Sequence, residues 1–141
     1  MKMRRKRKRR QSIWMLCLIP VFLLAACGKG SGDSSRETLD YEMVTEEQIP
    51  PELKTIMEEK KQAEFKLTYT CDGFLYLVVG LGQQETGGYS ISVRDLYLQG
   101  GSICLETESM GPTKEEAVSG TPSCPCLVIR LPYREEPVVF L

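Results

Sequence analysis

Cysteine is the residue type most capable of covalent, redox or metal chemistry in this 141-residue chain, which has six cysteines and no histidine. Without histidine, Ser-His and Cys-His catalysis and histidine-containing zinc sites are excluded. Two acidic pairs, Glu115-Glu116 and Glu135-Glu136, could in principle do acid–base work. Polar or turn residues flank both pairs, which favours solvated charge. We therefore expect no catalytic residues, no cofactor and no small-molecule substrate.

Four cysteines lie in the main body of the chain, namely Cys71, Cys104, Cys124 and Cys126. Their spacing lacks the paired Cys-x-x-Cys knuckles of a zinc site, so we expect no metal. Redox catalysis by Cys-Pro-Cys is also disfavoured, because the usual Cys-x-x-Cys at a helix start is missing.

Outside the cytoplasmic membrane, these four cysteines allow two disulfides in three connectivities. Alternation places Cys104 with Glu106 on the more polar face of its strand. If that strand and the strand over 127–131 are antiparallel neighbours, Cys104 can pair with Cys124 or Cys126. Such a bond would close a loop of about twenty residues, worth roughly 3 kcal/mol in the chain-entropy model. Free thiols are the alternative.

The N-terminus has the three parts of a secretory signal. Eight of the first ten residues are basic, an apolar run covers 13–24, and the small residues Ala25 and Ala26 lead into Cys27. Ile13 to Cys27 spans only 15 residues, short of the ~20 that a membrane-crossing helix needs. A cleaved signal over 1–26 is therefore favoured over a permanent transmembrane helix.

The sequence Leu24-Ala25-Ala26-Cys27 resembles the lipobox of bacterial lipoproteins. The resemblance implies that the Cys27 thiol receives a diacylglycerol and becomes the new amino terminus. Two acyl chains form a lasting anchor, whereas a single chain binds only marginally. We expect a lipid-anchored protein on the extracytoplasmic face of the cell membrane. A plain signal peptide cleaved near Ala26 and a nucleic-acid-binding basic arm are the alternatives.

The charge of the chain changes sign after the signal. The residues after position 26 have 10 basic and 19 acidic groups, a net charge of 10 − 19 = −9. An acidic protein is a poor ligand for nucleic acid or anionic headgroups. We therefore expect a protein partner with a neutral or basic surface.

The remaining chain divides into a tether, a helix and a β-rich domain. Residues 28–40 contain one apolar residue in thirteen, which predicts a flexible tether over 27–48. Ile49-Pro50-Pro51-Glu52 is typical of a helix start, and the apolar spacing predicts an amphipathic helix from about Pro51 to Glu64 within 49–64. Its Met and Leu stripe is expected to pack on the domain's own sheet; a partner-binding face is the alternative.

Residues 65–141 are expected to be mainly antiparallel β, sandwich- or barrel-like, giving an α+β protein with one N-terminal helix. Phe65, Leu67 and Tyr69 alternate with polar residues, which predicts a half-buried strand. The apolar run over 74–79 predicts a central strand covered on both faces. Further strands are predicted around 89–93, 103–107, 127–131 and 138–141, separated by Gly and Pro clusters.

The segment from Leu75 to Ile91 resembles the C-terminal domain of the PrcB family. The matching residues are Val78, Val79, Gly82, Thr86, Gly87, Gly88, Tyr89, Ser90 and Ile91. The likeness extends over about Phe65 to Leu141. The chain departs from the family pattern at Glu85, where the family has proline, and at Cys124-Pro125-Cys126, where it often has Tyr-Pro-Tyr.

The PrcB family takes its name from a lipoprotein subunit of a bacterial surface protease complex, so the resemblance implies a non-catalytic accessory or scaffolding subunit. The loop from Thr86 to Tyr89 is the candidate partner-binding site. For Thr86, Gly87 and Gly88, a structural role in a tight connection is an equal alternative. For Tyr89 we favour core packing beside Ile91 and Val93. The loop also resembles that of chagasin-type inhibitors, which makes protease inhibition the alternative function.

Overall fold

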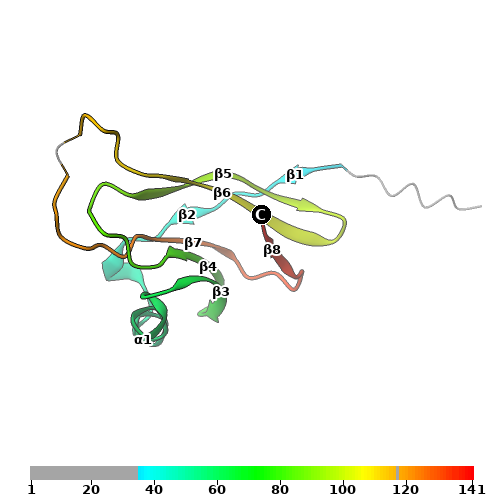
Figure 1. The fold of residues 1–141 in the computed structure, drawn as a ribbon. Coiled ribbons are helices and arrows are strands. Elements are labelled where there is room, and N and C mark those ends of the chain that lie inside the picture. Colours follow the sequence, from blue (N-terminus) through cyan, green and yellow to red (C-terminus); the bar gives the residue numbers. More distant parts are fainter. Residues whose placement is uncertain (1–34, 117) are drawn as a thin grey trace, which may run out of the picture. The chain divides into compact units, whose positions relative to one another are not determined.

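The computed structural model of the protein describes residues 35–116 and 118–141. Its elements are β1 (Glu37–Thr38), β2 (Glu42–Met43), the 3-10 helix η1 (Glu46–Gln48), α1 (Pro51–Lys60), β3 (Glu64–Cys71), β4 (Phe74–Leu81), β5 (Ser90–Gln99), β6 (Ser102–Met110), β7 (Cys126–Pro132) and β8 (Val138–Phe140). One four-stranded sheet has the order β1-β5-β6-β8, and the other has the order β2-β7-β4-β3 (Figure 1). The predicted fold class, mainly β with one preceding helix, is confirmed.

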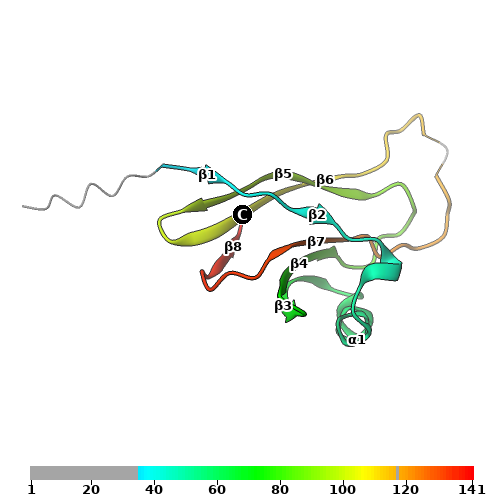
Figure 2. The same cartoon turned by 180° about the vertical axis from the view of Figure 1, so that it is seen from behind.

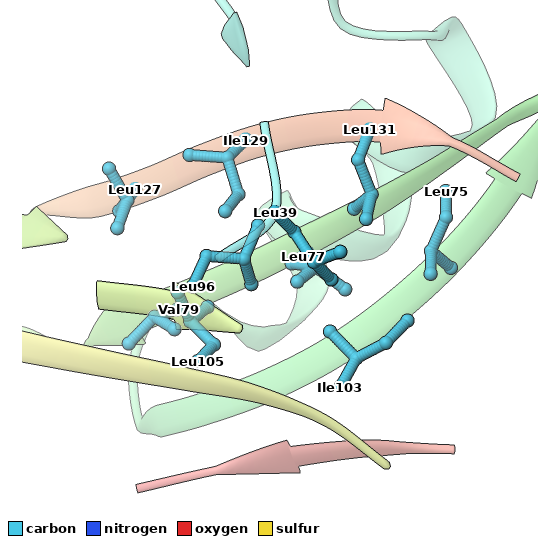
Figure 3. Close-up of a cluster of buried hydrophobic side chains, with 10 residues drawn as sticks. All are labelled: Leu39, Leu75, Leu77, Val79, Leu96, Ile103, Leu105, Leu127, Ile129 and Leu131. Carbon is cyan, nitrogen blue, oxygen red and sulfur yellow. The ribbon is translucent and has the colours of Figure 1, made fainter. Parts of the chain in front are cut away.

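The main hydrophobic core lies between the two sheets. Both sheets contribute to one cluster of buried side chains, which consists of Leu39, Leu75, Leu77, Val79, Leu96, Ile103, Leu105, Leu127, Ile129 and Leu131 (Figure 3). Because each strand turns alternate residues inward, two such faces packed together form a β-sandwich.

Strand β4 is covered on both faces, as its continuous apolar run predicts. It lies between β7 and β3 in the sheet order. Leu75, Leu77 and Val79 face the core between the sheets. Tyr76 and Val78 face a second cluster on the side of α1. Val78 and Val79 of the family motif are therefore part of a central strand.

Helix α1 packs on the protein's own sheet, because its Leu53 is fully buried in the second cluster. On β3, Phe65, Leu67 and Tyr69 pack against this cluster, and the residues between them are exposed, as predicted. The helix ends at Lys60, four residues earlier than expected. The reason is that Glu64 already pairs with Leu81 across β3 and β4.

The second half of the predicted tether is structured, which corrects the boundary at residue 48. Residues 37–43 pair first with β5 and then with β7, so this segment joins the edges of both sheets (Figure 2). The Leu39 side chain is 8% exposed and belongs to the core, and the Leu39 amide donates to the Leu96 carbonyl at 2.9 Å. One buried apolar residue at the crossing and edge-strand hydrogen bonds help to order this polar segment.

Two arginines hold this N-terminal segment in place. Arg36 stacks over the Tyr97 ring at 3.5 Å and pairs with Glu106 at 2.8 Å. On the other sheet, Arg130 pairs with Glu42 of β2 at 2.7 Å. The hydrogen bond from the Tyr97 hydroxyl to Glu106 is the main cause of the raised pKa of Tyr97.

The last strand joins its sheet in an unexpected direction. Strand β8 pairs parallel with β6, whereas the other pairs of strands in the described part of the chain are antiparallel. The chain reaches this position because it leaves β7 in one sheet and crosses to the far edge of the other sheet. The Ile103 amide donates to the Pro137 carbonyl at 2.8 Å.

Candidate functional site

Two loops are joined at one end of the sandwich. Residues 82–89 connect β4 to β5, and residues 111–125 connect β6 to β7 (Figure 1). Gln84 and Ser123 exchange backbone hydrogen bonds of 2.7 and 3.1 Å, and the Gly87 amide donates to the Ser119 carbonyl at 3.1 Å. We call these two segments, without residue 117, the paired loops. The predicted partner-binding residues belong to this arrangement.

Thr86 is held by the second loop. The Ser123 hydroxyl donates to the Thr86 carbonyl at 2.7 Å, and the Thr86 hydroxyl donates to the Gly87 carbonyl at 3.1 Å. The Thr86 side chain is partly buried. Its contacts therefore fix the backbone of the loop.

Gly88 permits close packing of the paired loops. Its φ is +85°, and an added methyl carbon would lie 2.8 Å from Val118 and 3.0 Å from Pro112. Only glycine accepts such a conformation without cost, and only glycine leaves room for the second loop. Gly87 is not among the described glycines with positive φ. The structure thus directly supports a structural role for Gly88 in a tight connection between the strands.

Tyr89 packs differently from our expectation. Its ring covers Gly111, where an added methyl carbon would lie 3.0 Å away. Ile91 and Val93 pack against the core between the sheets, but Tyr89 is not part of that cluster. Gly111 lies just beyond the Ser90–Met110 pair, opposite Tyr89. Because Gly111 has no side chain, the Tyr89 ring can pack over its backbone.

Exposed apolar side chains accompany the paired loops. Met110 is 52% exposed at the end of β6, and Val118 is 37% exposed beside Gly88. A shallow hollow of about 390 Å³ is lined by Gln83, Gln84, Glu85 and Pro122. The arrangement provides a preformed surface with apolar and polar groups, which is suited to contact with another protein.

The expected disulfide between Cys104 and Cys124 or Cys126 rests on a strand arrangement that the structure contradicts. Strand β6 pairs with β5 and β8, whereas Cys126 begins β7 in the other sheet. Cys104 is buried rather than on a polar face, and all four described cysteines are free. Burial is the main cause of the raised pKa of Cys71, which lies at the end of β3.

The acidic pairs have structural contacts. Glu116 accepts a hydrogen bond from the Thr113 amide at 2.9 Å, which closes a local turn. Glu136 accepts two hydrogen bonds from Arg134, and these lower the pKa of its carboxyl group. Within residues 35–116 and 118–141, no three His, Cys, Asp or Glu side chains are grouped closely enough to hold a metal ion.

The predicted signal peptide over 1–26 and the lipidation residue Cys27 lie outside the described residues. In the part of the chain that the structure describes, no helix has the length and apolar character needed to cross a membrane.

Comparison with protein families matches residues 75–132 to the model described as PrcB C-terminal. These residues comprise β4 to β7, the central strands of both sheets, together with the paired loops. This part of the chain is similar to the PrcB C-terminal domain, and the resemblance found in the sequence is confirmed. Neither the search of curated proteins nor the search of solved structures finds a match.

Sequence reasoning missed the second of the paired loops. Ser119 and Ser123 supply its hydrogen bonds to residues 84–87, and Val118 packs on Gly88. The sequence signal was a run rich in Gly, Ser, Thr and Pro, which indicates a connection but not its contact. The pairing of β4 with β7 and of β5 with β6 brings the two loops together.

Proposed function

We propose that this protein is a non-catalytic lipoprotein of the bacterial cell envelope, anchored through Cys27, whose PrcB C-terminal domain binds another extracytoplasmic protein. The partner suggested by the family name is a protease that the domain assembles, stabilises or positions. The observation that best supports binding is the pair of hydrogen-bonded loops with Met110 and Val118 exposed beside them. A surface that is already ordered loses little entropy when it binds.

Charge narrows the class of partner. The chain after residue 26 has a net charge of −9 from its 10 basic and 19 acidic groups. Exposed acids also accompany the paired loops, among them Glu85, Glu115 and Glu116. Complementary charge speeds association and discriminates between partners. A neutral or basic protein surface therefore suits this domain best.

The binding function can be tested with variants of exposed residues. The full chain is recovered from detergent-solubilised membranes of its source cells, and its co-purifying proteins are quantified by mass spectrometry. Met110→Ser and Val118→Ser remove apolar contact without opening the core. Met43→Ser is the matched control, because Met43 is 58% exposed on β2. We expect the first two variants to lose a partner that the control retains. Equal recovery by all three variants would refute the role of the paired loops.

Anchoring requires a separate experiment. Mass spectrometry of the mature N-terminus is expected to show a diacylglycerol on the Cys27 thiol, and Cys27→Ser is expected to lose stable membrane association. An unmodified thiol on freely secreted protein would contradict the lipoprotein assignment while leaving partner binding testable.

The alternative of a chagasin-like protease inhibitor requires residues Thr86 to Tyr89 to enter a protease cleft. In the structure the Thr86 carbonyl accepts a hydrogen bond from Ser123, and the Tyr89 ring covers Gly111. These groups already contact their own chain, which makes them less available to a protease cleft. Partner binding by the paired loops is the better-supported proposal. Inhibition of a cysteine protease by the full chain, abolished by replacing residues 86–89, would favour the alternative.

A further inference from the structure

Three sulfur-containing side chains from two regions of the chain line one cavity. The cavity has a volume of about 580 Å³ and lies where α1, residues 44–49 and the start of β7 meet. Met57 comes from α1, Cys124 precedes β7, and Cys126 is the first residue of β7, with Pro125 between the two cysteines. Both cysteines are free thiols. Cys124 belongs to the second of the paired loops, but this cavity shares no lining residue with the hollow beside those loops.

The backbone around the two thiols is fixed by the neighbouring strand. The Leu81 amide at the end of β4 donates to the Pro125 carbonyl at 3.0 Å, and Ser123 exchanges hydrogen bonds with Gln84. Proline restricts its own φ and keeps the preceding residue extended. Side chains two residues apart in an extended chain point the same way, and here both line the cavity. The two thiols are therefore presented together before any ligand arrives.

The ligand atoms available in this cavity determine which metal ion it can bind. Zinc requires four ligands, and no group of three His, Cys, Asp or Glu side chains that could hold a metal occurs among residues 35–116 and 118–141. Two acids line the cavity: Glu58 accepts a hydrogen bond from the Lys61 ammonium, and Glu46 forms an ion pair with Lys54 at 3.9 Å. Thiolate and thioether sulfur suit Cu(I), which is a soft cation. Two thiolates and one thioether would give Cu(I) three sulfur ligands.

We propose that Cys124, Cys126 and Met57 form a binding site for Cu(I). On binding, each thiol releases its proton to solvent and each sulfur forms one bond to copper, and the oxidation state of copper does not change. Two thiolates and one Cu(I) have a combined charge of −1. Lys54 and Lys61 line the same cavity beside Glu46 and Glu58, so the charged side chains of its wall cancel one another.

The test uses the full chain, reduced and handled without oxygen, with Cu(I) supplied as its bicinchoninate complex. We expect the wild-type protein to take one Cu(I) per chain from the competitor. Cys124→Ser and Cys126→Ser should each weaken binding by about 100-fold or more, because each removes one of two thiolates. Met57→Leu should weaken binding by about tenfold, since it removes a thioether but keeps the packing volume.

Cys104→Ser is the matched control, because Cys104 lies in the other sheet and away from the cavity. It should retain the wild-type affinity, and circular dichroism should show that all variants are folded. X-ray absorption of the loaded protein should show only sulfur neighbours around copper. Binding that survives both cysteine substitutions, copper bound by oxygen or nitrogen, or no retention against bicinchoninate would each overturn the proposal.

Discussion

The ring of Phe65 lies against the backbone of Gly80, its register partner across β3 and β4. A methyl carbon added to Gly80 would lie 2.3 Å from this ring, closer than real contacts allow. The absence of a side chain at Gly80 thus lets an aromatic ring cover the strand. The same relationship occurs at the paired loops, where Tyr89 covers Gly111.

Gly80→Ala is predicted to destabilise the protein by about 1–3 kcal/mol, because the new methyl group overpacks the site under Phe65. Urea unfolding monitored by circular dichroism measures this effect. Gly120→Ala is the control, since an added methyl carbon there meets nothing within 4 Å. In a Phe65→Ala background, Gly80→Ala should cost at least about 0.5 kcal/mol less. A cost unchanged by removal of the ring would show that overlap with Phe65 is not the cause.

Leu39→Ala is predicted to cost about 2–4 kcal/mol, because it removes a buried side chain from the core between the sheets. Met43→Ala, four residues later and 58% exposed, should cost less than about 0.5 kcal/mol. The comparison by urea unfolding tests whether this segment is part of the fold. Equal, small effects would show that residues 36–43 behave as a free tether.

Ser123→Ala is predicted to loosen the paired loops at a cost of about 0.5–1.5 kcal/mol, because the hydroxyl that bonds the Thr86 carbonyl is lost. Hydrogen exchange at the Gly87 amide, which donates to Ser119, should become faster. Ser109→Ala, on the exposed end of β6, is the control. Unchanged exchange at Gly87 would show that the second loop does not hold the first.

Acid is predicted to weaken the link between β7 and β8. The hydrogen bonds from Arg134 lower the pKa of Glu136 from the ordinary value of 4.5, so the folded state favours the ionised carboxyl. The resulting stabilisation is present above the ordinary value and is lost as the pH falls through the lowered pKa. Glu136→Gln should therefore be less stable than wild type at neutral pH, and the difference should shrink in acid. Urea unfolding at several pH values checks this, and a pH-independent difference would contradict it.

Much of the strand pattern could be predicted because it depends on local alternation. Phe65, Leu67 and Tyr69 are partly buried on one side of β3, and the continuous apolar run of β4 is covered on both faces. The start of α1 followed from its prolines. In contrast, its end at Lys60 depends on the pairing of Glu64 with Leu81, which is a long-range contact.

The candidate site was found in part. The motif located Thr86, Gly87, Gly88 and Tyr89, but the contacts of these residues come from Ser119, Ser123, Val118 and Gly111, more than twenty residues away. The composition of a loop predicts a turn, but it does not predict which other loop packs against it. That contact depends on which strands pair and so bring the two loops together.

The class of elements, the family resemblance and the sign of the charge could be read from local patterns, because composition, alternation and motif spacing need no knowledge of distant contacts. The sheet that each strand joins follows only from the folded domain. Its sheet order separates Cys104 from Cys126 and places Leu39 in the core. Such neighbours are selected by burial and backbone hydrogen bonding of the whole domain, and no short segment contains that information.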